Sequence, residues 1–145
     1  MSRYLVVGNR TLVGDHLTHA IERRARMGSC EVHIVVPQSE HTGGSDPTET
    51  DVAAAQARVD EATANFARVG AARVTHEFAG ADPVRAARAA LDRDPSFDEV
   101  LLSTMPPGPS RWLHLDVPHR LTRAVPIPVL HLVYDDGKTR PKLFG

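Results

Sequence analysis

Five short apolar runs, separated by stretches with helical spacing, constrain the fold of this chain more than any other feature. The runs lie at residues 3–8, 31–36, 72–78, 97–103 and 127–134. Apolar runs of this length are typical of strands that are buried on both faces. Strands that alternate with helices favour a parallel sheet with right-handed crossovers. The sequence therefore predicts an α/β fold, with a doubly wound parallel five-stranded sheet.

Capping and breaking residues predict where three of the helices begin and end. The first helix starts near Thr11, capped by Thr11 or Asp15, and ends at Gly28. Its inward positions are expected to be Leu12, Leu17, Ala20, Ile21 and Met27. A later helix opens at Asp82-Pro83, with Val84, Ala87 and Leu91 inward, and ends at Asp94-Pro95.

The longest helix is predicted to follow a long polar loop. Residues 38–50 are almost free of apolar side chains and contain Gly43-Gly44 and Asp46-Pro47, so we expect a loop there. Residues 48–51 have the shape of a capping box, which opens a helix that ends at Gly70. Its apolar stripe is expected at Val52, Gln56, Val59, Thr63, Phe66 and Val69.

Length, charge and cysteine content narrow the class of protein. A chain of 145 residues fits a single domain, which we place at residues 1–134, with a polar and frayed tail at 135–145. The net charge of −1 does not indicate nucleic acid as a partner. Cys30 is the one cysteine and is expected to be a buried thiol. No run is long enough for a signal peptide or a membrane span, so we expect a cytoplasmic protein without a membrane partner.

The stretch from Val100 to Arg120 carries the clearest candidate for a binding site. It runs from a strand through a Pro- and Gly-containing loop to a helix start, and such junctions hold anions in α/β proteins. The loop offers the backbone N–H groups near Gly108 and Ser110, the guanidinium of Arg111, and the hydroxyls of Ser103, Thr104 and Ser110. An equally weighted alternative is a tight turn held to the core by Trp112, Leu113 and Leu115.

Topology predicts which segments meet this loop. For a strand order of 3-2-1-4-5, the order reverses between the first and fourth strands, and ligands bind beyond the strand ends at that point. Gly8-Asn9 would therefore lie beside residues 103–110. Asp116 is expected to cap the following helix, and its charge would oppose a phosphate unless Arg111, His119 and Arg120 offset it.

Metal and nucleophile chemistry find little support in the sequence. His16 and His19 stand three residues apart on a helix, but no further ligands complete a metal set, and we interpret them as surface residues. His33 and His131 lie in predicted strands and are interpreted as buried or sheet-edge residues. A nucleophilic role for Cys30 or Ser103 lacks an identifiable base, and no phosphate-binding glycine motif occurs.

Residues 100–133 also resemble a known family. The closing strand begins Pro128-Val129-Leu130, and Ser103, Pro106 and Asp116 keep the spacing of three glycines in the nucleotide motif of universal stress proteins. Element order and length are similar over almost the whole chain. The resemblance implies the fold of that family and a homodimer formed through the last strand, residues 128–134.

The same resemblance implies ATP or AMP as a ligand, although the loss of the motif glycines disfavours it. Val117 takes the place of the Ser or Thr that contacts phosphate in the family, and Asn9 stands near the position of its usual Asp. The candidate ligand-binding residues are Gly8, Asn9, Val36, Ser103, Thr104, Gly108, Ser110, Arg111, Asp116 and Val117.

Three functions follow as expectations. The first is a regulatory or binding domain of the universal stress protein type, without a catalytic centre, that takes a nucleotide or a small anion weakly. The second is a nucleotide- or phosphoester-handling enzyme, in which Arg111 and Ser110 hold phosphate and His119 acts as acid or base. The third is an interaction module without a ligand.

Overall fold

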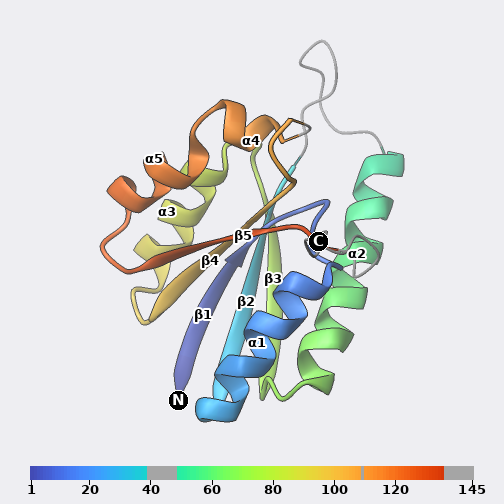
Figure 1. Cartoon of the computed structure of the whole chain (residues 1–145), viewed down its shortest axis with the longest axis vertical. Coiled ribbons are helices and arrows are strands. Elements are labelled where there is room, and N and C mark those ends of the chain that lie inside the picture. The colour runs from blue at the N-terminus through green and yellow to red at the C-terminus, as the bar shows by residue number, and fades with distance from the viewer. Residues whose placement is uncertain (39–48, 109, 136–145) are drawn as a thin grey trace, which may run out of the picture.

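The computed structural model describes residues 1–38, 49–108 and 110–135, which form one sheet with helices on both faces (Figure 1). Of the loop predicted at 38–50, residues 39–48 lie outside the described residues, as does the tail from 136. Residues 49 and 50 already belong to the helix that follows. The elements in chain order are β1 (Ser2–Val7), α1 (Asp15–Met27), β2 (Cys30–Pro37), α2 (Glu49–Arg68), β3 (Arg73–Ala79), α3 (Pro83–Arg93), β4 (Glu99–Thr104), α4 (Arg111–His114), α5 (Val117–Ala124) and β5 (Val129–Val133).

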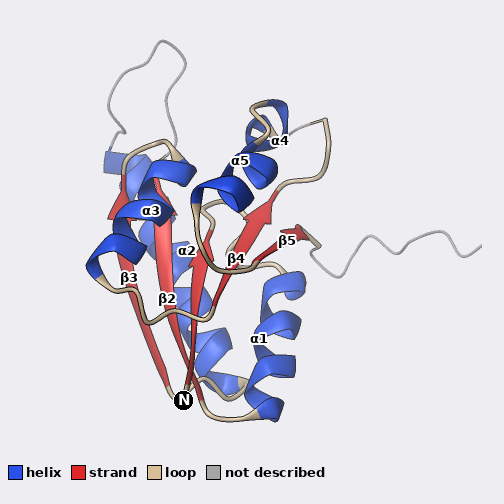
Figure 2. Cartoon of the chain, turned by 90° about the vertical axis from the view of Figure 1, so that its left-hand side faces the viewer, coloured by secondary structure: helices blue, strands red, loops and turns tan. Residues whose placement is uncertain are grey.

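All five strands are parallel, in the order β3-β2-β1-β4-β5, which confirms the predicted fold class and strand order. Helices α1 and α2 cover one face of the sheet, and α3 and α5 cover the other, as the turned view shows most clearly (Figure 2). The strand order reverses between β1 and β4, so the polypeptide leaves these two neighbouring strands in opposite directions. None of the described helices is long and apolar enough to cross a membrane.

Alternation along the strands divides the apolar side chains between two cores. Val6 and Leu101 pack into the core under α1 and α2, while Val7 and Leu102 pack into the core under α3 and α5. All four side chains are fully buried. The central strands β1 and β4 are therefore apolar on both faces, as the continuous runs in the sequence indicated. The polar groups of these strands are confined to their ends.

Helix α1 begins four residues later than predicted. It starts at Asp15 behind Gly14, which makes no side-chain cap hydrogen bond, so neither Thr11 nor Asp15 caps the helix. Residues 9–14 instead form a turn in which the Leu12 N–H donates to the Asn9 carbonyl. The prediction for Met27 is also wrong, because its side chain is 84% exposed at the last turn. The late start of α1 leaves the buried Thr11 beside the end of β4.

Helix α2 packs through a stripe shifted toward small residues. Ala55, Val59, Ala62 and Phe66 are buried against the sheet. Val59 and Phe66 agree with the predicted stripe, whereas Val52 is exposed. The alanines let the helix approach the strands closely while Phe66 fills the space near β3 and α1. The predicted capping box begins at residue 48, which lies outside the described residues.

Helix α3 follows the prediction at both ends. The Asp82 carboxylate accepts hydrogen bonds from the N–H groups of Val84 (3.0 Å) and Arg85 (3.4 Å), and Pro83 occupies the first helical position. The helix ends at Asp94, and Val84, Ala87 and Leu91 are buried. This helix start lies next to the carboxyl ends of β1 and β2, and so forms one wall of the pocket described below.

Candidate functional site

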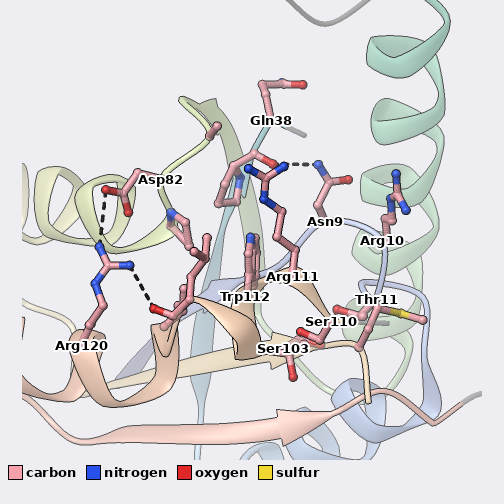
Figure 3. A pocket seen from close by; sticks show the side chains of 17 residues that line it. Asn9, Arg10, Thr11, Gln38, Asp82, Ser103, Ser110, Arg111, Trp112 and Arg120 are labelled. Carbon is pink, nitrogen blue, oxygen red and sulfur yellow. Dashed lines mark hydrogen bonds and ion pairs between the residues drawn. The ribbon is translucent and has the colours of Figure 1, made fainter. Parts of the chain in front are cut away.

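A pocket of about 440 Å³ lies at the carboxyl ends of β1, β2 and β4, where the strand order reverses (Figure 3). Three chain segments contribute its polar floor: residues 9–11 after β1, residues 37–38 at the end of β2, and residues 103–105 at the end of β4. The start of α3 and the segment from Ser110 through α5 close its sides. The location agrees with the switch point predicted from the strand order.

The structure brings six of the ten candidate ligand-binding residues onto this pocket and leaves four away from it. The residues on the lining are Asn9, Ser103, Thr104, Ser110, Arg111 and Val117. The side chain of Val36 is fully buried in the core under α1 and α2, and its neighbours Pro37 and Gln38 line the pocket instead. Gly8, Gly108 and Asp116 are also absent from the lining.

Asn9 joins the ends of β1 and β2 to helix α2. Its Nδ2 donates to the Pro37 carbonyl at 2.7 Å, and its Oδ1 accepts from Nη2 of Arg58 at 2.7 Å. The residue is only 6% exposed. Both ends of the amide are therefore engaged within the protein, which fixes the position of Asn9 in the pocket wall.

Ser103 is the centre of a short line of polar contacts beneath the pocket. Its hydroxyl lies 2.5 Å from Oγ1 of Thr11 and 2.6 Å from Nε2 of His16. The interpretation of His16 as a surface residue is wrong, because the ring is half-buried against β4 and burial lowers its pKa. Sequence reasoning missed this contact because the two residues are 87 positions apart in the chain.

Thr104 makes the equivalent contact on the opposite face of the sheet. Its Oγ1 lies 2.8 Å from Nε2 of His131 on β5. Burial lowers the pKa of His131, so both histidines near the pocket favour the neutral form. The two hydroxyls at the end of β4 are thus each held by a histidine, one on either face.

The loop after β4 contains a short helix that the sequence did not predict. Ser110 is its N-cap: the hydroxyl accepts a hydrogen bond from the Leu113 N–H at 3.1 Å. Trp112 packs against the core under α3 and α5, in agreement with its predicted anchoring role. Leu115 is half exposed and lies on the pocket lining, so it does not anchor the turn. Arg111, the first residue of this helix, lies on the pocket lining.

Asp116 does not cap helix α5 as predicted. Its backbone is left-handed (φ 55°, ψ 39°), and its carboxylate makes no cap hydrogen bond. The carboxylate instead lies 3.3 Å from Nδ1 of His119, and both side chains are exposed. The negative charge that was expected to oppose a phosphate is therefore turned toward solvent and away from the pocket lining.

Arginines dominate the charge of the pocket. Arg10, Arg111 and Arg120 line it, against the single carboxylate of Asp82. Arg120 lies 3.8 Å from Asp82, at the opposite end of the pocket from Arg10 (Figure 3). Arg58 lies behind Asn9, and its pKa is lowered by burial and by the charge of Arg10. Its Nε atom is buried without a hydrogen-bond partner. The described lining thus has more positive than negative groups.

The candidate list did not include eleven lining residues: Arg10, Thr11, Pro37, Gln38, Ala81, Asp82, Pro83, Met105, Trp112, Leu115 and Arg120. A signal existed for some of them. Gln38 and Asp82 follow predicted strands two and three, and residues directly after parallel strands gather at the same edge of the sheet. Among the described residues, no group of three or more His, Cys, Asp or Glu side chains is placed to hold a metal ion.

A doubly wound parallel sheet with a polar pocket at its switch point defines a class of α/β domains that bind small ligands. Comparison with solved structures identifies the fold more specifically. The universal stress protein UspA from Lactobacillus plantarum matches with a TM-score of 0.67 and 17% identity, over 90% of this chain and 97% of that one. A universal stress protein from Archaeoglobus fulgidus matches with a TM-score of 0.65 and 13% identity, over 91% and 93%.

Two related matches hold nucleotides. The Archaeoglobus fulgidus protein has a structure in complex with dAMP (TM-score 0.64, 13% identity, 91% of this chain and 97% of that one). Another universal stress protein is in complex with cAMP (TM-score 0.57, 20% identity, 89% and 95%). No family profile and no curated protein sequence matches the chain. The chain has the universal stress protein fold.

Proposed function

We propose that this chain is a universal stress protein that binds a nucleoside monophosphate, or a phosphate-bearing ligand of similar size, in the pocket at its switch point. It acts as a cytoplasmic regulatory binding domain and carries out no catalysis of its own. The observation that carries the proposal is the charge of the lining, three arginines against one aspartate, at the place where this fold binds ligands.

The state of the other polar groups supports an anion held by arginine. Asn9, Ser103, Thr104 and Ser110 each hydrogen-bond to another group of the protein. The guanidinium groups of Arg10, Arg111 and Arg120 are the cationic groups of the lining, and guanidinium forks match phosphate oxygens well. Because the loop after β4 contains prolines, it has fewer backbone N–H groups than a glycine-rich loop. A monophosphate suits such a loop better than a triphosphate.

Size and fold point to the same class of ligand. A pocket of about 440 Å³ is in the range of small-molecule sites. Two proteins of the same fold are in complex with dAMP and with cAMP, which each carry one phosphate. Trp112 and Leu115 provide apolar surface on the lining, which suits a base or ribose. These similarities support the proposal through the fold, since the identities are 13% and 20%.

The side chains that could act in catalysis are bound to other groups of the protein, which favours a binding function over a catalytic one. The Ser103 hydroxyl is 1% exposed and is shared between two neighbours. His119, the acid or base of the rival enzyme hypothesis, lies off the lining and pairs with Asp116. Steady release of adenosine or inorganic phosphate from AMP by the purified protein, abolished in Arg111→Ala, would contradict the non-catalytic proposal.

Calorimetric titration of the purified chain tests the ligand. AMP, dAMP and cAMP are expected to bind, adenosine and inorganic phosphate more weakly, and ATP no better than AMP. Replacement of Arg111 by Ala should weaken AMP binding by about ten- to a hundredfold, because a charge-assisted hydrogen bond is lost. Arg88→Ala is the matched control, since Arg88 is an exposed arginine of α3 away from the lining. Absence of binding by all of these ligands would refute the proposed ligand class.

The proposal includes a homodimer formed through β5. This strand is an edge of the sheet, Leu130 and Leu132 are only partly buried, and Val133 is 40% exposed. An apolar edge strand is a surface that a second copy can cover. Sedimentation equilibrium should give twice the chain mass, and Val133→Arg should shift the mass toward that of the monomer. A monomeric wild-type protein would refute this part of the proposal.

A further inference from the structure

A line of hydrogen bonds runs from the end of β5 to the floor of the pocket. The backbone N–H of Asp135 donates to Nδ1 of His16 at 3.2 Å. Nε2 of the same ring lies 2.6 Å from the Ser103 hydroxyl, which lies 2.5 Å from Oγ1 of Thr11. We propose that every group in this line donates toward the pocket, from Asp135 through His16 and Ser103 to Thr11. Thr11 is then a fixed hydrogen-bond donor to the ligand and a residue that determines specificity. The ligand part of this inference rests on the proposed function.

The direction follows from the backbone group at one end. A backbone N–H can only donate, so Nδ1 of His16 must accept and cannot carry a hydrogen. In a neutral imidazole the hydrogen is then on Nε2, which donates to the Ser103 hydroxyl. Ser103 is 1% exposed, and among the described residues its hydroxyl contacts His16 and Thr11, so the hydrogen that it does not use toward the histidine goes to Oγ1 of Thr11. Thr11 is left with one hydrogen to donate.

The opposite direction places two hydrogens against each other. If Ser103 donated to Nε2, the hydrogen of the neutral ring would be on Nδ1 and would face the Asp135 N–H. Two donors that face each other replace a hydrogen bond with a repulsive contact, so this direction is disfavoured. The same assignment means that His16 cannot remove the Ser103 proton in this arrangement. The pair is therefore a positioning device and does not activate Ser103.

The surroundings hold the His16 ring in place. The Asp15 N–H donates to the Asp135 carbonyl at 2.8 Å, which ties the start of α1 to the residues after β5. The Tyr134 ring meets the imidazole edge-on, with 5.6 Å between the centroids. A side chain at Gly14 would collide with the His16 ring and would come within 2.9 Å of Tyr134. Glycine at this position therefore allows the ring to lie where it contacts both Asp135 and Ser103.

Thr11 is the member of this line on the pocket side of His16. It lines the pocket beside Ser103 and is 3% exposed (Figure 3). A donor at this point favours an acceptor atom, such as a phosphate or carboxylate oxygen, and disfavours a group that can only donate. The arginines supply charge, whereas Thr11 supplies a donor whose position is fixed by buried neighbours. The ligand class expected at this point is an oxyanion.

Nitrogen-15 NMR of the ligand-free protein tests the direction without any ligand. Long-range proton–nitrogen spectra distinguish a protonated ring nitrogen from an unprotonated one, and His16→Gln identifies the signals of His16. We expect a hydrogen on Nε2 and none on Nδ1 near neutral pH. A hydrogen on Nδ1 would overturn the inference. This measurement gives its answer even if the protein binds no nucleotide, so the two proposals can fail separately.

Titration with AMP and with adenosine tests the role of Thr11. Thr11→Val should weaken AMP binding by about tenfold or more and leave adenosine binding unchanged, whereas Thr11→Ser, which keeps the hydroxyl, should bind AMP nearly as wild type does. Equal AMP affinity in Thr11→Val and wild type would overturn the inference while leaving the proposed function intact. Thermal unfolding of both variants shows whether each is folded at the titration temperature, and Thr11→Ser serves as the comparison if Thr11→Val is not.

Discussion

The two ends of the sheet use arginine in different ways. At the amino end, Arg24 pairs with Glu99, and Arg3 pairs with Glu31 and Asp94, so each guanidinium has a carboxylate partner. At the carboxyl end, Arg120 lies 3.8 Å from Asp82, the one carboxylate on the described lining. Arg58 donates to the neutral amide of Asn9, and its pKa is lowered by burial and by the charge of Arg10.

This difference separates two physical roles. Arginines that are paired within the fold hold elements together, and little of their charge is available to a ligand. Arginines that gather around a pocket with one carboxylate leave a positive region that an anion can neutralise. We call the amino end of the sheet the structural end and the carboxyl end, which carries the proposed site, the binding end. Each can be tested by removing one group and measuring both stability and ligand affinity.

The largest effect is expected at the structural end. Arg24 donates to both carboxylate oxygens of Glu99, at 2.9 and 3.2 Å, and its side chain is only 14% exposed. Arg24→Met should lower the free energy of unfolding by about 2 kcal/mol, because Glu99 would keep a half-buried charge without its partner. AMP affinity should not change. Chemical denaturation and calorimetry measure the two quantities.

The control for this variant is an exposed arginine on the same helix. Arg26 forms an ion pair with Glu22 at 3.5 Å within α1, and its side chain is 75% exposed. Arg26→Ala should change the free energy of unfolding by no more than about 0.5 kcal/mol. If Arg24→Met lowered AMP affinity as much as Arg111→Ala does, the distinction between the two ends would be wrong.

A smaller effect on stability is expected at the binding end, with a larger effect on the ligand. Ser110 caps α4 and is 3% exposed. Ser110→Ala should lower the free energy of unfolding by about 1 kcal/mol, because the Leu113 N–H loses its acceptor. It should also weaken AMP binding, since α4 carries Arg111 and Trp112 on the pocket lining. Ser110→Thr retains the acceptor and should lose less stability and less AMP affinity. An unchanged AMP affinity in Ser110→Ala would show that the cap does not contribute to ligand binding.

The sequence predicted the fold well because the fold depends on local patterns. Continuous apolar runs identified all five strands, and Asp82 with Pro83 identified the start of α3, since capping and apolar periodicity act within a few residues. Errors occurred at helix ends. Met27 and Val52 continue an apolar stripe in sequence but lie beyond the part of the helix that faces the sheet.

The location of the pocket was predicted from the sequence, but its lining residues were predicted only in part. Strand order located Asn9, Ser103 and Arg111 on one pocket. The contacts that fix these groups join residues far apart in the chain, such as His16 with Asp135, 119 positions away. Helix α4 was missed because a helix of four residues has no periodicity and depends on one buried cap. Local patterns thus determine the scaffold, whereas the polar network depends on the assembled structure.

The two ends should also differ in the pH range over which they lose stability. Burial lowers the pKa of His16, although the contact with the Asp135 backbone and the charges of Asp135 and Asp15 oppose this; burial also lowers the pKa of His131. The unfolded chain, in which histidine has a pKa of about 6.5, then binds more protons than the folded protein. Stability at the binding end therefore falls as the pH drops below about 7, and levels off once the folded histidines are protonated.

The structural end responds only in acid. Hydrogen bonds from Ser96 and Arg3 lower the pKa of Asp94 to about 2, so its contribution persists above pH about 4 and is lost as the pH falls through about 2. Unfolding in urea across this range should show a slope between pH 7 and 5 that flattens in the His16→Gln, His131→Gln double variant and persists in Asp94→Asn. Since the Asp94 carboxylate is exposed, solvent screens its interactions, and the loss of stability on its protonation in acid is the smallest of the expected effects. If Asp94→Asn removed the change in the free energy of unfolding between pH 7 and 5, that change would come from the structural end of the sheet. This result would contradict the comparison between the two ends.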